Sequence, residues 1–117
     1  MSNVRAMVSN VEVGDLDAAL ELYQNLAGDE AVRRFSYRDL ELALVGLFLL
    51  VSGAIEKHVS QVATVVVESL DPVLKALDAA GAEILEGPDQ TSNGTRFVIR
   101  HPDGAVFEYM QPTASAS

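Results

Sequence analysis

The feature of this sequence that most constrains its fold is an internal duplication. Residues 8–20 align with residues 62–74 at a constant offset, and a glycine follows each aligned segment, at Gly28 and Gly81. A duplication of this size predicts two modules packed as a pseudo-symmetric pair, because solenoids need three or more repeats. The six identical pairs are Val8/Val62, Val11/Val65, Val13/Val67, Leu16/Leu70, Asp17/Asp71 and Leu20/Leu74.

The first half predicts the element order strand, helix, strand, strand, strand. Alternation over 7–13 predicts a strand with Met7 on its core face and Asn10 on a partly wet face. Asp15 or Asp17 suits the start of the helix that Gly28 ends. The later strands are expected over 31–38, 40–45 and 47–51, followed by a linker over 52–57.

The second half repeats this order. Asp71 is expected to cap its helix, and Pro72 fits the first helical turn. The strands after this helix are expected over 82–85, 95–100 and 105–110, with a loop over 86–94. The sequence therefore predicts the α+β class, with two tandem βαβββ modules.

The expected domain organisation follows from the duplication and the length. At 117 residues, the chain has the size of one domain with a single core. We predict one domain over 1–112, with module one at about 4–53 and module two at about 58–112. The remaining residues, 113–117, are expected to be a disordered tail.

The segment most informative about function is HPDGAVFEYMQP, residues 101–112. Pro102, Asp103 and Gly104 have turn chemistry, and the residues that follow are typical of a short strand. Glu108 is the one charge inside that apolar strand. A buried carboxylate costs several kcal/mol unless a metal, a base or hydrogen-bond donors meet it. Glu108 is therefore expected to face a wet cavity or to have a partner.

Composition excludes several kinds of site and partner. The chain has no cysteine and only two histidines, His58 and His101, so thiolate chemistry and a three-histidine metal site are excluded. The net charge of −9 argues against a nucleic-acid partner. No segment has the pattern of a signal peptide or is apolar for long enough to span a membrane. We expect a cytoplasmic protein with no membrane partner.

Residues 11–28, 67–88 and 101–112 resemble the vicinal oxygen chelate superfamily, which includes glyoxalase I, extradiol dioxygenases and bleomycin-resistance proteins. The resemblance extends over about 4–112 and depends most on the turn-then-glutamate pattern that ends in Glu108. It implies paired βαβββ modules that form a cupped, incompletely closed mixed sheet with helices on its outer face. It also implies a small organic ligand in the cup and a homodimer.

The resemblance also implies where a metal would be held. The family's ligand positions map onto Val8, Leu49, Val62 and Glu108, and only Glu108 has a side chain that can coordinate an ion. A shift of one residue would offer Gln61 in place of Val62. Because catalytic sites of this type usually need three protein ligands, we expect no family-type metal site and no cofactor.

Four residues are the candidate ligand-binding set: Glu108, Asn10, Thr64 and Arg96. Glu108 can bond a ligand or act as a general base, or it can instead be an inherited carboxylate paired with Arg96 or Arg100. Asn10 and Thr64 are expected on the inner face of the sheet, where a solvated face explains them nearly as well. Phe107 and Tyr109 alternate with Glu108 and are expected to face the helix, while His58 is expected to be exposed and His101 structural.

The preferred hypothesis is a metal-free small-molecule-binding protein of the glyoxalase/bleomycin-resistance type that sequesters a ligand or an antibiotic. One alternative is an enzyme, either a lyase or isomerase with Glu108 as its catalytic base, or a metal-dependent enzyme such as a dioxygenase. Another alternative is a structural or interaction module whose cup is filled by its own side chains. The lack of tryptophan weakens the specific hypothesis of bleomycin binding, because stacking on a flat drug needs exposed rings.

Overall fold

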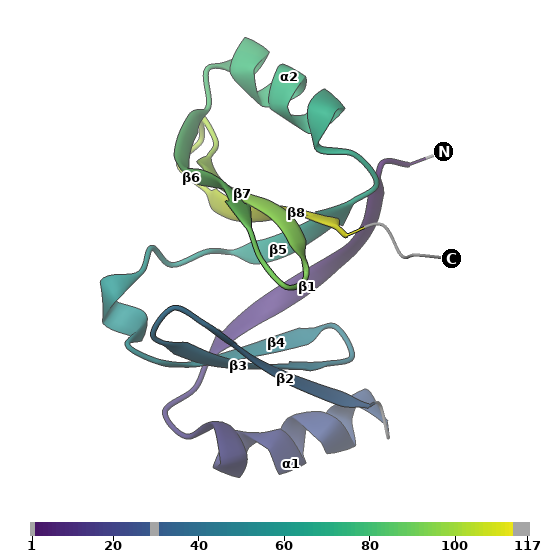
Figure 1. The fold of residues 1–117 in the computed structure, drawn as a ribbon, viewed down its shortest axis with the longest axis vertical. Coiled ribbons are helices and arrows are strands. Elements are labelled where there is room, and N and C mark those ends of the chain that lie inside the picture. Colours follow the sequence, from purple (N-terminus) through teal and green to yellow (C-terminus); the bar gives the residue numbers. More distant parts are fainter. Residues whose placement is uncertain (1, 29–30, 114–117) are drawn as a thin grey trace. The chain divides into compact units, whose positions relative to one another are not determined.

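The structure is a computed structural model that describes residues 2–28 and 31–113. Within them, each half of the chain has the order strand, helix, strand, strand, strand (Figure 1). The tail predicted over 113–117 lies outside the described residues from 114 onward. The elements are β1 Val4–Glu12, α1 Leu16–Ala27, β2 Val32–Tyr37, β3 Leu40–Val45, β4 Phe48–Gly53, η1 Ile55–Lys57, β5 Ala63–Val67, α2 Leu70–Ala80, β6 Glu83–Gln90, β7 Gly94–Arg100 and β8 Val106–Pro112.

The strands follow the order β2-β3-β4-β1-β5-β8-β7-β6 in one eight-stranded sheet. The pairs β1–β4 and β5–β8 are parallel, and the hairpin pairs within each half are antiparallel. The α+β class, the repeated βαβββ order and the mixed sheet are thus confirmed. No helix among the described residues is long and apolar enough to cross a membrane.

The chain divides into two compact units, and the division falls inside β1. Residues up to Met7 belong with those from Ser60 onward, which we call the C-terminal unit. Residues Val8–Val59 form the N-terminal unit. Among the described residues, each unit contains one α-helix and its own hydrophobic cluster.

In the N-terminal unit, α1 packs on β3 and β4 through Leu16, Ala43 and Leu50. Asp15 is the residue that caps α1, because its carboxylate accepts a hydrogen bond from the backbone N–H of Ala18 at 3.2 Å. The helix ends at Gly28 in the left-handed conformation, as predicted. The partly buried side chains around this cluster are Val11, Val13, Ala19, Leu20, Tyr23, Val32 and Phe48.

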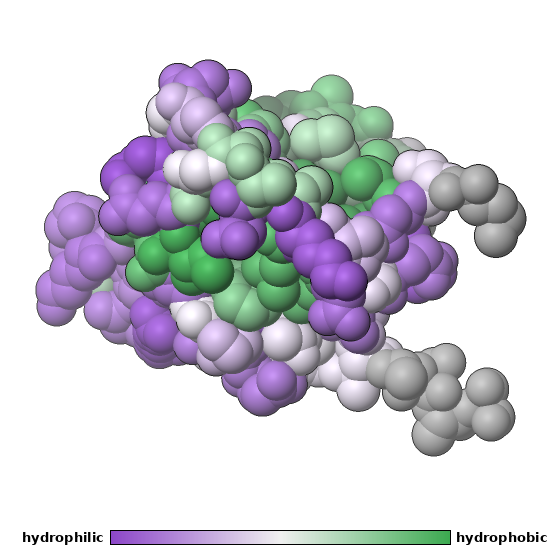
Figure 2. All heavy atoms as spheres, turned by 90° about the horizontal axis from the view of Figure 1, so that it is seen from above, coloured by the Kyte–Doolittle hydropathy of each residue, from purple (hydrophilic) through white to green (hydrophobic). Residues whose placement is uncertain are grey.

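At the start of β1, the buried face of the strand is the opposite of the one that the sequence predicted. The predicted core residue Met7 is 52% exposed, whereas Val8 is only 7% exposed. The strand also begins at Val4, three residues before the predicted start, so its first part belongs to the other unit. Figure 2 shows hydrophobic side chains at the surface among hydrophilic ones, and Met7, Val62 and Ile84 are among the exposed large hydrophobic residues of the chain.

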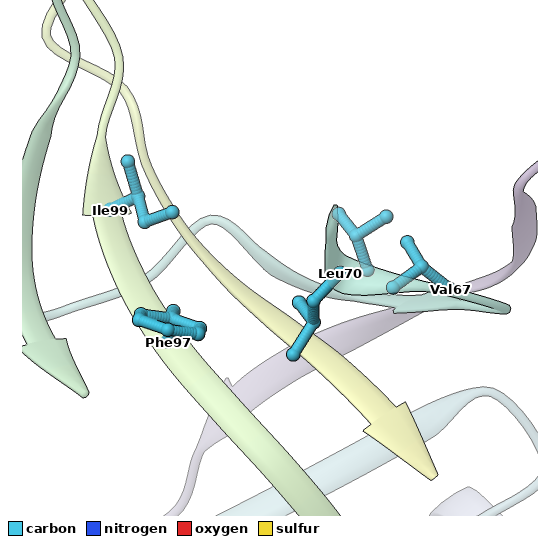
Figure 3. Packing of buried hydrophobic residues seen from close by; sticks show 5 residues of the cluster. Val67, Leu70, Phe97 and Ile99 are labelled. Carbon is cyan, nitrogen blue, oxygen red and sulfur yellow. The ribbon is translucent and has the colours of Figure 1, made fainter. Parts of the chain in front are cut away.

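In the C-terminal unit, α2 packs on β5 and β7 through a cluster of apolar side chains. Figure 3 shows Val67, Leu70, Phe97 and Ile99 of this cluster. Phe107 and Tyr109 of β8 pack against the same cluster, which confirms that they face the helix. Because side chains alternate along a strand, Glu108 points to the opposite face. The buried members of the cluster are Val65, Val67, Leu70, Phe97 and Ile99.

The start of α2 corrects the prediction that Asp71 caps it. The N-cap residue is Ser69, and its side chain makes no capping hydrogen bond. The N–H of Leu70 instead donates to the side-chain amide of Gln111 at 2.8 Å, and Asn3 exchanges two hydrogen bonds with the backbone of Ser69. Residues far apart in the sequence therefore satisfy donors that a local cap usually satisfies.

Two predicted irregular segments are instead ordered elements. The predicted loop over 86–94 is largely strand, because β6 continues to Gln90 with register shifts on either side of Glu86. Gly87 permits the irregular path: its φ is 106°, and a Cβ there would lie 2.6 Å from the carbonyl oxygen of Arg96. The predicted linker over 52–57 contains the end of β4 and the short helix η1.

The long-range cap of α2 gives the first prediction. Gln111→Ala and Asn3→Ala should each lower the free energy of unfolding by about 1 kcal/mol, which is a typical value for loss of a helix cap. Ser69→Ala is the matched control and should change stability little, because that hydroxyl makes no capping bond. Urea unfolding followed by circular dichroism measures all three variants. A larger loss for Ser69→Ala than for Gln111→Ala would contradict the assignment.

Candidate functional site

Glu108 lies on β8 and is 8% exposed. The backbone register places it opposite Thr64 on β5 and opposite Val98 on β7. Both neighbours are also buried, so the carboxylate lies in the middle of three adjacent strands, on the face away from α2. A carboxylate in such a place must be hydrogen-bonded to be tolerated.

Two side chains satisfy the Glu108 carboxylate. The hydroxyl of Thr64 donates to Oε1 at 2.6 Å, and Nε of Arg96 donates to Oε2. The expected pairing of Glu108 with an arginine is thus confirmed for Arg96. Arg100 is not a partner: it is 46% exposed and pairs with Glu83 at 2.9 Å.

Arg96 is the centre of a larger network and is only 4% exposed. Its Nη1 donates to Glu86 at 3.2 Å and to Asp89 at 3.0 Å, both on β6. One guanidinium therefore holds carboxylates from the strands on both sides of β7. Sequence reasoning missed Glu86 and Asp89 because it assigned them to a loop, although Asp89 lies directly opposite Arg96 in the register.

Asn10 belongs to the N-terminal unit and lies opposite Leu49 in the parallel pair of β1 and β4. The pair Asn10/Leu49 corresponds to Thr64/Glu108 in the other unit, because both are parallel pairs of the first and last strands of a module. Leu49 is thus the counterpart of Glu108. The duplicated positions now carry a carboxylate in one half and an aliphatic side chain in the other.

The resemblance places a family-type metal centre at Val8, Leu49, Val62 and Glu108, and these side chains do not fit one. Val8, Leu49 and Val62 have no donor atoms, and Glu108 is already bonded to Arg96 and Thr64. Across residues 2–28 and 31–113, no group of three or more histidine, aspartate or glutamate side chains is placed to hold an ion. A divalent ion at Glu108 would also lie next to a buried guanidinium, which is electrostatically unfavourable.

The two histidines have partners away from Glu108. Nε2 of His101 lies 2.8 Å from the hydroxyl of Tyr109, and the His101 ring stacks on Phe107. Partial burial raises the pKa of Tyr109 above its ordinary value of 10.0. His58, which was expected to be exposed, is only 18% exposed and lies 2.5 Å from the Asp39 carboxylate. The hydrogen bond from His58 lowers the pKa of Asp39.

Comparison with known proteins decides the family. A family model described as glyoxalase/bleomycin resistance protein/dioxygenase superfamily matches residues 10–109. The chain belongs to this superfamily. No functionally curated protein matches it.

Solved structures of the superfamily's fold are similar over nearly the whole chain. An uncharacterized protein from Methanosarcina mazei is 32% identical, with 99% of this chain and 98% of that chain covered and a TM-score of 0.88. Methylmalonyl-CoA epimerase from Mycobacterium tuberculosis is 22% identical, with coverage of 97% and 92% and a TM-score of 0.76. Streptomyces coelicolor methylmalonyl-CoA epimerase in complex with 2-nitronate-propionyl-CoA is 19% identical, with coverage of 97% and 100% and a TM-score of 0.71. At these identities the epimerases share the fold alone.

The Arg96 network gives the second prediction. Arg96→Met should lower the free energy of unfolding by about 3–5 kcal/mol, because it leaves a buried carboxylate without its charged partner. Arg100→Met is the matched control on the same strand and should cost about 0–1 kcal/mol, since its ion pair is exposed. Replacing Glu108 by Leu in the Arg96→Met background should restore part of the loss. Denaturant unfolding that gave equal costs for the two single variants would contradict a buried pair.

Proposed function

We propose that this protein is a small-molecule-binding member of the superfamily and that it works without a metal ion or other cofactor. The observation that most strongly supports a site without a metal is that both oxygens of Glu108 accept hydrogen bonds from the chain's own side chains. In metal-dependent relatives, a metal ion is the positive charge beside the carboxylate. Here the guanidinium of Arg96 is that positive charge. The site can therefore hold its charge in place without an ion.

The proposed ligand is a small organic molecule that carries a hydroxyl or amine group. A carboxylate has about four acceptor positions, and Thr64 and Arg96 use two of those on Glu108. The apolar side chains nearby include Val98 and Met110, both buried. Binding sites for small molecules commonly combine apolar walls with a few fixed polar groups. Glu108, Thr64 and Arg96, all in the C-terminal unit, are the proposed polar contacts.

An enzyme is the second candidate, because the similar solved structures include methylmalonyl-CoA epimerases. A lyase or isomerase activity would need a proton acceptor within reach of its substrate. Glu108 could take that role as a catalytic residue only by sharing or releasing the hydrogen bonds from Arg96 and Thr64. This requirement makes ligand binding the function that the geometry supports better. A module with a filled interior is the third candidate, and it predicts no ligand at all.

We also propose that the protein acts in the cytoplasm as a homodimer, with sequestration of a metabolite or antibiotic as its role. The dimer is supported by large hydrophobic side chains at the surface, for which association is one common explanation. Examples in the N-terminal unit are Leu22, Leu26 and Leu47, each more than half exposed. Analytical ultracentrifugation distinguishes the dimer from a monomer.

The third prediction tests the binding function with a thermal-shift screen of metabolites, acyl-CoA thioesters and antibiotics. A matching compound should raise the melting temperature of the wild type equally with and without added divalent ions. Glu108→Gln should reduce the shift, because an amide offers a weaker acceptor to a ligand hydroxyl or amine. Glu83→Gln is the matched control, since Glu83 pairs with Arg100 at the surface. A ligand shift that is the same in both variants would remove Glu108 from the site, and a shift that requires divalent ions would favour the metal enzyme.

A further inference from the structure

The hairpin that joins β6 to β7 contains the one asparagine of the chain that a glycine follows. The asparagines are Asn3, Asn10, Asn25 and Asn93, and only Asn93 precedes a glycine, Gly94. The backbone nitrogen that follows an asparagine can attack the side-chain amide, and a glycine lets this nitrogen approach closely because it has no Cβ. The pair with the greatest intrinsic tendency to react therefore lies in this turn.

Packing fixes the glycine of this pair. Gly94 has a φ of 147°, and a Cβ at this position would lie 2.1 Å from the carbonyl oxygen of Gln111 and 2.8 Å from the Cα of Pro112. No side chain fits between the start of β7 and the end of β8 at this point. The fold therefore requires a glycine here, and the reactivity of the preceding asparagine is a consequence of that requirement.

The side-chain amide of Asn93 is held less firmly than its backbone. Its Oδ1 is buried and has no hydrogen-bond partner among the described residues. A buried acceptor without a donor costs free energy, so this position of the amide is unfavourable compared with a hydrogen-bonded one. The carbonyl oxygen of Asn93, by contrast, accepts a hydrogen bond from the N–H of Thr113 at 3.1 Å. The reactive group is thus the least restrained part of an ordered turn.

Thr91 holds the nitrogen that would attack this amide. The N–H of Gly94 donates to the carbonyl oxygen of Thr91 at 3.3 Å and to its hydroxyl at 3.2 Å. The same hydroxyl accepts from the N–H of Asn93 at 3.1 Å and donates to the carbonyl oxygen of Gly94 at 3.0 Å. Attack requires the nitrogen of Gly94 to lose its proton and to turn toward the amide, and these hydrogen bonds oppose both changes.

We propose that Asn93 is a site of spontaneous deamidation and that the hydroxyl of Thr91 slows the reaction. When the turn opens, the nitrogen of Gly94 bonds to Cγ of Asn93, the bond from Cγ to Nδ2 breaks, and ammonia leaves with the proton of that nitrogen. Water then opens the cyclic imide at either carbonyl, which gives aspartate or isoaspartate. Either product places a carboxylate where the amide oxygen had no donor, and burial of such a charge is costly.

Deamidation should loosen the end of β8. In isoaspartate the main chain runs through the former side chain, so the carbonyl that bonds the N–H of Thr113 leaves the main chain. The close packing of Gly94 against Pro112 is lost with it. Because the neighbouring Gln111 caps α2, the effect should extend to that helix.

Incubation of the full chain at mildly alkaline pH, followed by peptide mapping with mass spectrometry, tests the site. Asn93 should be converted to aspartate and isoaspartate with release of ammonia, whereas the exposed Asn25 of α1 should stay unchanged over the same period. The converted protein, separated by anion exchange, should melt at a lower temperature than the unconverted protein. Conversion of Asn25 as fast as that of Asn93, or equal melting temperatures of the two forms, would overturn the proposal.

Hydroxyl variants test the role of Thr91. Thr91→Val should raise the rate at Asn93 about fivefold, the effect of losing one hydrogen bond that keeps the turn closed. Thr91→Ser keeps the hydroxyl and should react at the wild-type rate. Thr95→Val is the matched control, because that hydroxyl lies in the same hairpin but bonds Gln90 at 3.0 Å. Equal acceleration in Thr91→Val and Thr95→Val, or a parallel rise at Asn25 through opening of the whole chain, would overturn the role of Thr91.

Discussion

The ion pair between Arg96 and Glu108 is the interaction on which the C-terminal unit most depends. Both side chains are buried, so neither charge can be left without the other at acceptable cost. Arg96 also bonds Glu86 and Asp89, and this ties the irregular strand β6 to β7 while Glu108 ties β7 to β8. The register shifts of β6 bring its acidic side chains onto the guanidinium. The ion pair therefore influences both the path of a strand and the chemistry of the candidate site.

The two halves of the duplication carry different side chains at corresponding positions of their first and last strands. The N-terminal unit has Asn10 beside Leu49, whereas the C-terminal unit has Thr64 beside Glu108 at the corresponding places. The aliphatic side chain of Leu49 offers no donor to an ion, in contrast to the carboxylate of Glu108. Glu108 is paired with Arg96, which lies in the same half of the chain. The two halves therefore share the βαβββ order but carry different side chains at these corresponding positions.

The sequence predicted the elements that depend on local pattern. The duplication, the ends of α1, and the faces of Phe107 and Tyr109 all follow from periodicity and glycine placement. The features it missed depend on contacts between distant residues. Gln111 caps α2 from 41 positions away, and a strand with shifted register around Glu86 has the composition of a loop. For the candidate site, Glu108 and its arginine were predictable, but the choice of Arg96 over Arg100 depends on which end of β7 is buried.

The most direct test of the central claim is a crystal structure of protein soaked in a manganese or zinc salt, with anomalous scattering measured at the metal's absorption edge. The account predicts electron density for Arg96 next to Glu108 and no anomalous peak at that carboxylate. A strong peak coordinated by Glu108, with Arg96 turned away from it, would contradict the claim that the arginine supplies the charge at this site.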